Sequence, residues 1–227
     1  MTERAAGGPG GAGPTGGAGP NRPTGPTGAS PALVLASGSP RRTELLTRWG
    51  LEHEVDPARV PEVVHAGEGP FSHVKRLARD KARAVAARHP GRLVLAGDTE
   101  VVLDGRTLGK PRDPEGARKM LRELSGRTHR VITGLALAGP GPGELRSRCD
   151  VAQVTFRQLS EADIVDYVAT GEPMDKAGGY GIQGLGGALV TRVEGDYYTV
   201  VGLPVSGLVD LLEEAGWRYA FGALVPR

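Results

Sequence analysis

The sequence contains one cysteine, few aromatic residues and no long apolar run, and each shortage narrows the class of protein. The single Cys149 in 227 residues excludes an internal disulfide and a zinc site built from several thiolates. No apolar run approaches the ~20 residues that a membrane-spanning helix needs. Residues 1–30 also lack the apolar segment of a secretory signal. We therefore expect a soluble, cytoplasmic protein with no membrane partner.

The charges are nearly balanced. Lys and Arg number 28 against 26 Asp and Glu, which gives a formal net charge of +2. This balance is too even for a domain that binds duplex nucleic acid or for an acidic disordered tail. We expect no nucleic-acid partner.

Glycine and proline are concentrated at the N-terminus. Residues 1–30 hold 10 Gly and 5 Pro and contain no Val, Ile, Leu, Phe, Trp or Tyr. Such a segment cannot bury enough apolar surface to offset the entropy of ordering it. The sequence therefore predicts a disordered Gly/Pro-rich extension over 1–30 and one folded domain over 31–227.

Strand and helix patterns alternate through the rest of the chain. Short apolar runs predict strands over 33–36, 92–96, 127–138, 145–158 and 188–193, and a hairpin over 101–108 that turns at Asp104-Gly105. Apolar periodicity and cap residues predict helices over 40–49, 71–88, 114–124, 161–169 and 204–215. This alternation is typical of an α/β fold with a mixed sheet.

The first candidate site is Ser37-Gly38-Ser39-Pro40-Arg41-Arg42, which directly follows a buried strand. A helix N-terminus favours an anion, yet Arg41 and Arg42 place cations there. A bound phosphate chain would relieve this conflict, because Arg binds phosphate through two hydrogen bonds. The alternative is a surface helix start with solvated Arg side chains.

Two further segments carry charged groups toward a cleft. Lys81 follows Val74 by seven residues, so it shares the apolar face of its helix and either snorkels to solvent or reaches into a cleft. Gly97-Asp98-Thr99 stands at the end of the strand predicted over 92–96, where ligands of open α/β sheets gather. Asp98 is therefore a candidate to bind a metal or a water. The alternative is an ordinary aspartate in a turn.

Two glycine-rich segments resemble phosphate-binding motifs only by letter. Gly105 to Lys110 is one residue short of a Walker motif and continues with Pro111 where Ser or Thr must hold magnesium. Gly179 to Gly184 matches G-x-G-x-x-G, but it neither follows a strand nor opens a helix. Its glycines still allow close approach to a ligand, and Gln183 offers both a donor and an acceptor to a base edge. The five histidines show no metal spacing and no consistent partner.

Together these segments resemble the Maf family of nucleoside triphosphate pyrophosphatases, first associated with septum formation. The similarity runs from Leu33 to about Glu214, and its motifs are long. They are Leu35 to Arg42, Arg76 to Ala82, Gly97 to Thr99, Leu108 to Pro111, Leu124 to Arg127 and Asp175 to Gly187.

The resemblance implies a fold and an activity. The fold is Maf/ITPase-like, a mixed, strongly twisted sheet flanked by helices, with two lobes around a central cleft. The activity is hydrolysis of a nucleoside triphosphate between its α- and β-phosphates, with a divalent cation, Mg²⁺ or Mn²⁺. A homodimer is expected only by analogy with the family. A nucleotide-binding regulator of cell division without catalysis is the alternative.

The resemblance also implies roles for individual residues. Asp98 takes the position of the general base or metal-binding carboxylate, and Glu62 that of a second acidic metal residue. Phosphate-binding positions fall on four residues: Ser37, Arg42, Lys81 and Lys110. Base-selecting positions fall on Arg41, Thr99 and Gln183, a trio that matches the branch acting on dTTP and UTP, with modified pyrimidine nucleotides as further candidates.

The chain departs from the usual family pattern at three places. Pro61 precedes Glu62 where Asp is common, and Gly97 stands where Ala is usual. Glu100 replaces a residue that is usually apolar, and we expect its side chain to point away from that of Asp98.

Overall fold

The computed structural model describes residues 33–141 and 143–227, so the extension predicted over 1–30 lies outside the described residues. The α-helices of the described part are α1 (Pro40–Arg48), α2 (Pro70–Ala86), α3 (Pro114–Leu124), α4 (Glu161–Ala169), α5 (Tyr197–Val201) and α6 (Val205–Glu214). The five predicted helices are confirmed to within two residues at each end. The short α5 was not predicted. No helix among these residues is long and apolar enough to cross a bilayer.

The strands are β1 (Leu33–Leu35), β2 (His53–Val55), β3 (Leu93–Leu103), β4 (Arg106–Leu108), β5 (Thr128–Ala138), β6 (Leu145–Phe156), β7 (Val190–Glu194), β8 (Trp217–Tyr219) and β9 (Leu224–Pro226). Three of them, β2, β8 and β9, were not predicted, because each has only three residues and none is a fully buried apolar run like β1. Three 3₁₀ turns, Glu172–Asp175, Ala177–Gly179 and Leu185–Leu189, follow α4.

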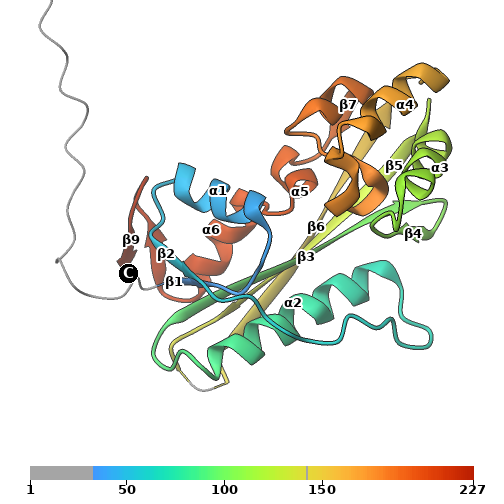
Figure 1. Cartoon of the computed structure of the whole chain (residues 1–227). Coiled ribbons are helices and arrows are strands. Elements are labelled where there is room, and N and C mark those ends of the chain that lie inside the picture. Colours follow the sequence, from blue (N-terminus) through green and yellow to red (C-terminus); the bar gives the residue numbers. More distant parts are fainter. Residues whose placement is uncertain (1–32, 142) are drawn as a thin grey trace, which may run out of the picture. The chain divides into compact units, whose positions relative to one another are not determined.

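The main sheet is mixed, as the sequence predicts. Its strand order is β2-β1-β3-β5-β6-β7, with β4 also paired to β3. The pairs β2–β1 and β1–β3 are parallel, whereas β3, β5, β6 and β7 pair antiparallel. The long strands β3, β5 and β6 run through the whole domain and carry helices on both sides (Figure 1).

The prediction that Asp98 follows the end of a strand is wrong. The segment 93–103 is one continuous strand, and Asp98 lies at its middle. Glycine and aspartate are poor strand formers, so the sequence alone indicates a break at Gly97-Asp98. Pairing with β5 along residues 94–102 holds this segment extended despite its composition.

The two faces of the sheet are covered by different helices. Alternate strand positions place Leu33, Leu95 and Leu135 in a core with leucines of α1 and α6. The intervening positions are smaller, with Val34, Ala96 and their neighbours packing against alanines and valines of α2. Large side chains thus face two helices, while small ones let α2 lie close to the sheet.

A second core occupies the other end of the long strands. It is formed by side chains of β3, β4, β5 and β6 with the buried faces of α3 and α4. The domain therefore has two lobes that share one sheet, as expected from the family resemblance. Ile182 packs against both cores.

One edge of β3 is interrupted between the lobes. On this edge, β1 pairs with residues 93–95 and β4 with residues 101–103, while the other edge belongs to β5. In the described chain, residues 97–100 therefore have no strand beside them on this edge. The gap exposes side chains from both faces of β3 to one space, and it sets the position of the site.

Close packing of α2 on the sheet depends on Gly134 of β5. A Cβ atom at this position would lie 2.6 Å from the Val74 carbonyl oxygen in α2. Because this neighbour is backbone, a side chain at position 134 would push the helix away from the sheet.

We predict that Gly134→Ala lowers the free energy of unfolding by about 1–3 kcal/mol, measured by urea denaturation. Gly116→Ala in α3 is the control, since its Cβ meets nothing closer than 3.4 Å and alanine raises helix propensity. An equal or smaller loss in Gly134→Ala than in Gly116→Ala would contradict this account of the packing.

Candidate active site

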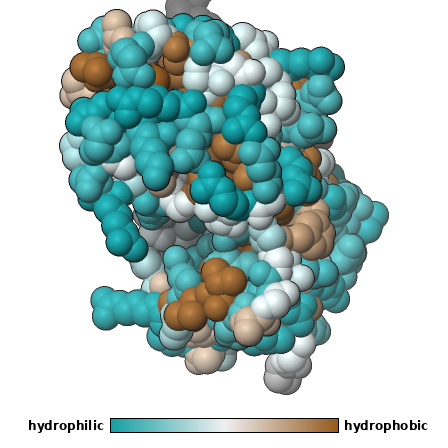
Figure 2. Space-filling view, turned by 90° about the vertical axis from the view of Figure 1, so that its right-hand side faces the viewer, coloured by the Kyte–Doolittle hydropathy of each residue, from teal (hydrophilic) through white to brown (hydrophobic). Residues whose placement is uncertain are grey.

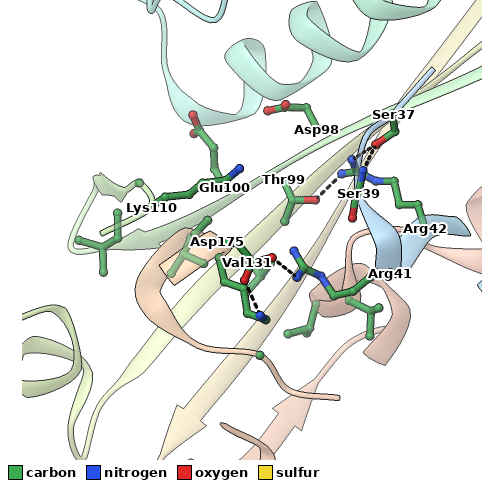
Figure 3. A pocket seen from close by; sticks show the side chains of 18 of the residues that line it. Ser37, Ser39, Arg41, Arg42, Asp98, Thr99, Glu100, Lys110, Val131 and Asp175 are labelled. Carbon is green, nitrogen blue, oxygen red and sulfur yellow. Dashed lines mark hydrogen bonds and ion pairs between the residues drawn. The ribbon is translucent and has the colours of Figure 1, made fainter. Parts of the chain in front are cut away.

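A cavity of about 620 Å³ opens at the gap in the edge of β3 and is lined by residues of both lobes. This volume is in the range of small-molecule sites. All nine site residues predicted from the sequence line it: Ser37, Arg41, Arg42, Glu62, Lys81, Asp98, Thr99, Lys110 and Gln183. Residues that lie up to 146 positions apart in the chain thus meet in one pocket. Figure 3 labels Ser37, Arg41, Arg42, Asp98, Thr99 and Lys110 among them.

Arg42 is the buried cation of this pocket. Its Nε donates to the Gly202 carbonyl oxygen at 2.7 Å, and its Nη1 donates to Ser37 Oγ at 2.9 Å. Its Nη2 donates to Thr99 Oγ1 at 3.1 Å (Figure 3). Burial lowers the pKa of Arg42 to about 10, so the guanidinium remains charged at neutral pH. All three acceptors are uncharged, and no described carboxylate forms an ion pair with it.

The absence of a side chain at Gly97 leaves space for the Arg42 guanidinium. A Cβ at position 97 would lie 3.0 Å from Arg42 Nε. The departure from the usual alanine of the family therefore removes a close contact with Arg42.

The N-terminus of α1 faces the same pocket. Ser39 is the N-cap residue and Pro40 opens the helix, as predicted, although the Ser39 side chain makes no capping hydrogen bond. The first turn contains no acidic residue, and Gly38, Ser39 and Arg41 line the cavity. The partial positive charge of a helix N-terminus thus adds to that of Arg42.

Lys81 reaches the pocket rather than bulk solvent. Its Nζ lies 2.6 Å from Asp98 Oδ1 and 2.5 Å from Glu62 Oε1, and its side chain is only 12% exposed. Burial raises the pKa of Glu62, but the hydrogen bond and the charge of Lys81 outweigh burial and lower it overall. Lys81 therefore holds two carboxylates together.

This carboxylate pair fits one way of holding a divalent cation. No group of three or more His, Cys, Asp or Glu side chains within the described ranges forms a protein-only metal site. Mg²⁺ is commonly held by one or two carboxylates, with substrate phosphates and water completing its shell. Asp98 and Glu62 suit that arrangement.

Glu100 does not point away from Asp98. Both line the pocket, because residues i and i+2 of a strand share one face. Glu100 is buried and accepts from Thr107 Oγ1 at 3.0 Å, and its Oε1 lies 2.5 Å from His73 Nδ1. His73 therefore has a partner that the sequence did not reveal, while its Nε2 has no hydrogen-bond partner among the described residues.

The remaining charged groups differ in their pairing. Arg41 Nη1 lies 3.5 Å from Asp175 Oδ2 (Figure 3). Lys176 Nζ lies 2.5 Å from Asp175 Oδ1. Lys110 forms no ion pair with any residue that the structure describes. The pocket thus offers two cations, Arg42 and Lys110, whose charge no contacting carboxylate neutralises.

The glycine-rich segment that carries Gln183 is held by Glu172. This carboxylate accepts from the backbone N–H groups of Leu185 at 2.9 Å and Gly186 at 3.0 Å. It also accepts from Tyr167 Oη, which in turn accepts from Gly181 N at 3.0 Å. A Cβ at position 186 would lie 2.5 Å from Tyr167 Oη, which explains a glycine there. Nothing in the sequence marks Glu172 for this role.

The segment that carries Glu62 is fixed to α2 by Arg76. Arg76 Nε and Nη2 donate to the two oxygens of Glu68 at 2.7 and 2.8 Å, and Nη2 also donates to the Val63 carbonyl oxygen at 2.8 Å. The hydrogen bond from Arg76 lowers the pKa of Glu68 from 4.5 to about 2. The Arg76 guanidinium thus holds both Val63 and Glu68, and so fixes the loop between them.

We predict that Arg76→Met destabilises the protein at pH 7 and that this difference from the parent shrinks as the pH falls. Because folding lowers the pKa of Glu68, its contribution is complete above pH 4.5 and is lost toward pH 2. Urea denaturation at pH 7 and pH 3 measures the effect. Arg83→Met, an exposed position of the same helix, is the control. A difference that stays constant over this pH range would contradict the prediction.

The face of the molecule seen in Figure 2 is mainly hydrophilic, with only small apolar patches. It shows no broad apolar surface that would compete with the pocket as a binding site.

Comparison with known proteins agrees with the motifs. The family model "Maf-like protein" matches residues 32–215. The dTTP/UTP pyrophosphatase of Koribacter versatilis is 50% identical over 184 residues, 81% of this chain and 94% of that protein. The dTTP/UTP pyrophosphatase of Myxococcus xanthus is 54% identical over 190 residues, 82% of this chain and 95% of that protein. The solved structure of the Staphylococcus aureus Ham1 protein overlaps 55% of this chain and 71% of that one, with 17% identity and a TM-score of 0.39. By the family match and the identity of about 50% to the two pyrophosphatases, the chain belongs to the Maf family.

Proposed function

We propose that this protein hydrolyses dTTP and UTP between the α- and β-phosphates, releasing pyrophosphate and the nucleoside monophosphate. The Maf relatives named above are dTTP/UTP pyrophosphatases, and this chain covers more than nine-tenths of each. Such an enzyme would serve to clear unwanted nucleotides, modified pyrimidine nucleotides included.

The observation that carries the proposal is the charge pattern of the pocket. Arg42 and Lys110 bring positive charge that no contacting carboxylate neutralises, and they share the pocket with Asp98 and Glu62 on Lys81. A nucleoside triphosphate carries about four negative charges at neutral pH, which suits these cations and the N-terminus of α1.

The carboxylates supply the chemistry at the α-phosphorus. Asp98 Oδ1 accepts from Lys81, while Oδ2 has no hydrogen-bond partner among the described residues and is available to orient a water. The attacking water oxygen forms a bond to the α-phosphorus and gives up a proton to Asp98 or to solvent. The bond from phosphorus to the bridging oxygen breaks, and its electron pair leaves on pyrophosphate. Lys81 and Arg42 stabilise the negative charge that moves onto the leaving group.

A divalent cation, Mg²⁺ or Mn²⁺, would be held by Asp98 and Glu62 together with phosphate oxygens. When bound, it would supply further positive charge to the polyphosphate. Asp98 either binds this ion or orients the water, and both roles need its carboxylate.

Base selection is assigned to Arg41, Thr99 and Gln183, which line the pocket from three separate segments. The Gln183 amide offers a donor and an acceptor, as a thymine or uracil edge requires. Arg41 closes the pocket from α1 through its contact with Asp175.

A non-catalytic regulator of cell division would need the cleft but no carboxylates converging on a lysine. The homodimer expected by analogy with the family stays a prediction, which light scattering of the purified protein tests.

We predict that Asp98→Asn slows pyrophosphate release from dTTP by about 10²–10⁴-fold, because the variant lacks the anionic oxygen. The measurement is a coupled pyrophosphate assay on purified protein with Mg²⁺. Asp104→Asn, at the exposed turn that ends the same strand, is the matched control and should keep parental activity. Parental activity in Asp98→Asn would overturn the catalytic assignment, and a parent that releases no pyrophosphate from any nucleotide would favour the regulator.

We also predict that dTTP and UTP are hydrolysed with higher kcat/KM than ATP and GTP. Gln183 is exposed, and a bound base would cover its amide. A substrate that then leaves this donor or acceptor unpaired loses up to about 10⁴-fold against one that pairs it. Gln183→Ala should reduce the ratio of kcat/KM for dTTP to kcat/KM for ATP by a larger factor than it reduces kcat for dTTP. Equal turnover of all four nucleotides by the parent would contradict the assignment of the base pocket.

A further inference from the structure

Behind Arg42 lies a chain of hydroxyl groups that starts at Thr99, which lines the pocket, and continues to Thr133, which does not. Thr99 of β3 and Thr133 of β5 are register partners across the sheet, and their Oγ1 atoms are 2.9 Å apart. Thr133 is fully buried, and its Oγ1 lies 2.8 Å from the Thr199 carbonyl oxygen in α5. Together with Arg42, these groups form one continuous hydrogen-bonded chain.

The direction of every proton in this chain is fixed. The Thr199 carbonyl oxygen can only accept, so Thr133 donates to it. The Thr133 oxygen must then accept from Thr99, since a hydroxyl has a single proton. Thr99 therefore presents a lone pair to Arg42 Nη2, which can only donate. The order is Arg42 to Thr99 to Thr133 to the backbone.

The Arg42 guanidinium is also held to the end of α5 by a direct hydrogen bond. Arg42 Nε donates to the carbonyl oxygen of Gly202, the residue that caps α5. A Cβ at position 202 would lie 3.1 Å from Thr99 Oγ1, so a side chain at this position would press on the Thr99 hydroxyl. Arg42, β3, β5 and α5 thus form a closed ring of hydrogen bonds.

The chemical character of the ring matters as much as its geometry. A carboxylate in place of Thr99 would hold Arg42 equally well but would neutralise it. Hydroxyl and carbonyl oxygens fix the guanidinium without cancelling its charge, and one N–H on each terminal nitrogen has no described partner. The buried charge is therefore both oriented and available to an anion.

We propose that Thr133 is a positioning residue for polyphosphate binding, because it turns the Thr99 hydroxyl into a fixed acceptor that orients Arg42. This inference rests on the proposed function, since it assigns the anion to the triphosphate of the substrate. Without the Thr133 oxygen, the Thr99 proton has no fixed acceptor and the hydroxyl is free to turn away from Arg42.

The test is binding of inorganic tripolyphosphate, measured by isothermal titration calorimetry, together with kcat and KM for dTTP. Thr133→Val has nearly the same shape and lacks the hydroxyl. It should weaken tripolyphosphate binding by about tenfold or more, because the hydrogen bond from the charged Arg42 to Thr99 is no longer held in place, and raise KM more than it lowers kcat. Thr133→Ser keeps the hydroxyl and should stay within about threefold of the parent.

Thr128→Val is the matched control. Thr128 lies on the same strand and also forms a threonine pair, with Thr155 Oγ1 at 2.8 Å, but it is exposed and far along β5. Its tripolyphosphate binding should equal that of the parent. If Thr133→Val does not fold, Thr133→Cys replaces it with the same expected outcome, since a thiol is a weak acceptor.

A double-mutant cycle with Arg42→Lys tests the route of the effect. Lysine cannot make the three hydrogen bonds of Arg42, so Thr133→Val should cause little further loss in that background. An equal loss in both backgrounds would overturn the proposal, as would parental binding by Thr133→Val or a parent that does not bind tripolyphosphate. The proposed function fails separately, if the parent binds tripolyphosphate but releases no pyrophosphate from dTTP.

Discussion

Burial of one positive charge without a contacting carboxylate is the constraint on which the site depends. Removing a guanidinium from water is costly unless its hydrogen bonds are replaced. Here Ser37, Thr99 and Gly202 replace them with neutral oxygens that come from three separate segments. These segments must therefore fold together before the charge is tolerated, and the N-terminus of α1, the middle of β3 and the end of α5 are joined at one point.

The sheet makes this meeting possible. Because β1 stops at Leu35 and β4 begins pairing only at Val101, the middle of β3 is open on one edge. Thr99 faces Arg42, while Asp98 on the opposite face meets Lys81 from α2. A continuous neighbouring strand would close this edge and separate the two sets of groups. The interrupted edge thus lets a polyphosphate-binding group and a carboxylate group share one pocket.

Much of the site could be predicted from local patterns and from the long family motifs. Ser39-Pro40 marks the start of α1. The position of Lys81 on the apolar face of α2 left two alternatives, snorkelling to solvent or reaching into a cleft, and the structure shows the second. What local patterns miss depends on pairing across the sheet. Gly97-Asp98 indicates a turn by composition, yet β5 holds it as strand. Thr133 is an ordinary strand residue until Thr99 is placed beside it, and Glu172 is an ordinary acid until the glycine segment folds over it.

The glycines near Gln183 have a consequence for how this pocket can change. Glu172 and Tyr167 occupy the volume where side chains at positions 184 and 186 would stand. A substitution at either glycine must displace the carboxylate or the phenol that anchors the segment, whereas Gln183 projects from the same backbone without that restriction. A change at Gln183 can therefore alter which base the pocket prefers without displacing Glu172 or Tyr167, which anchor the backbone of the segment.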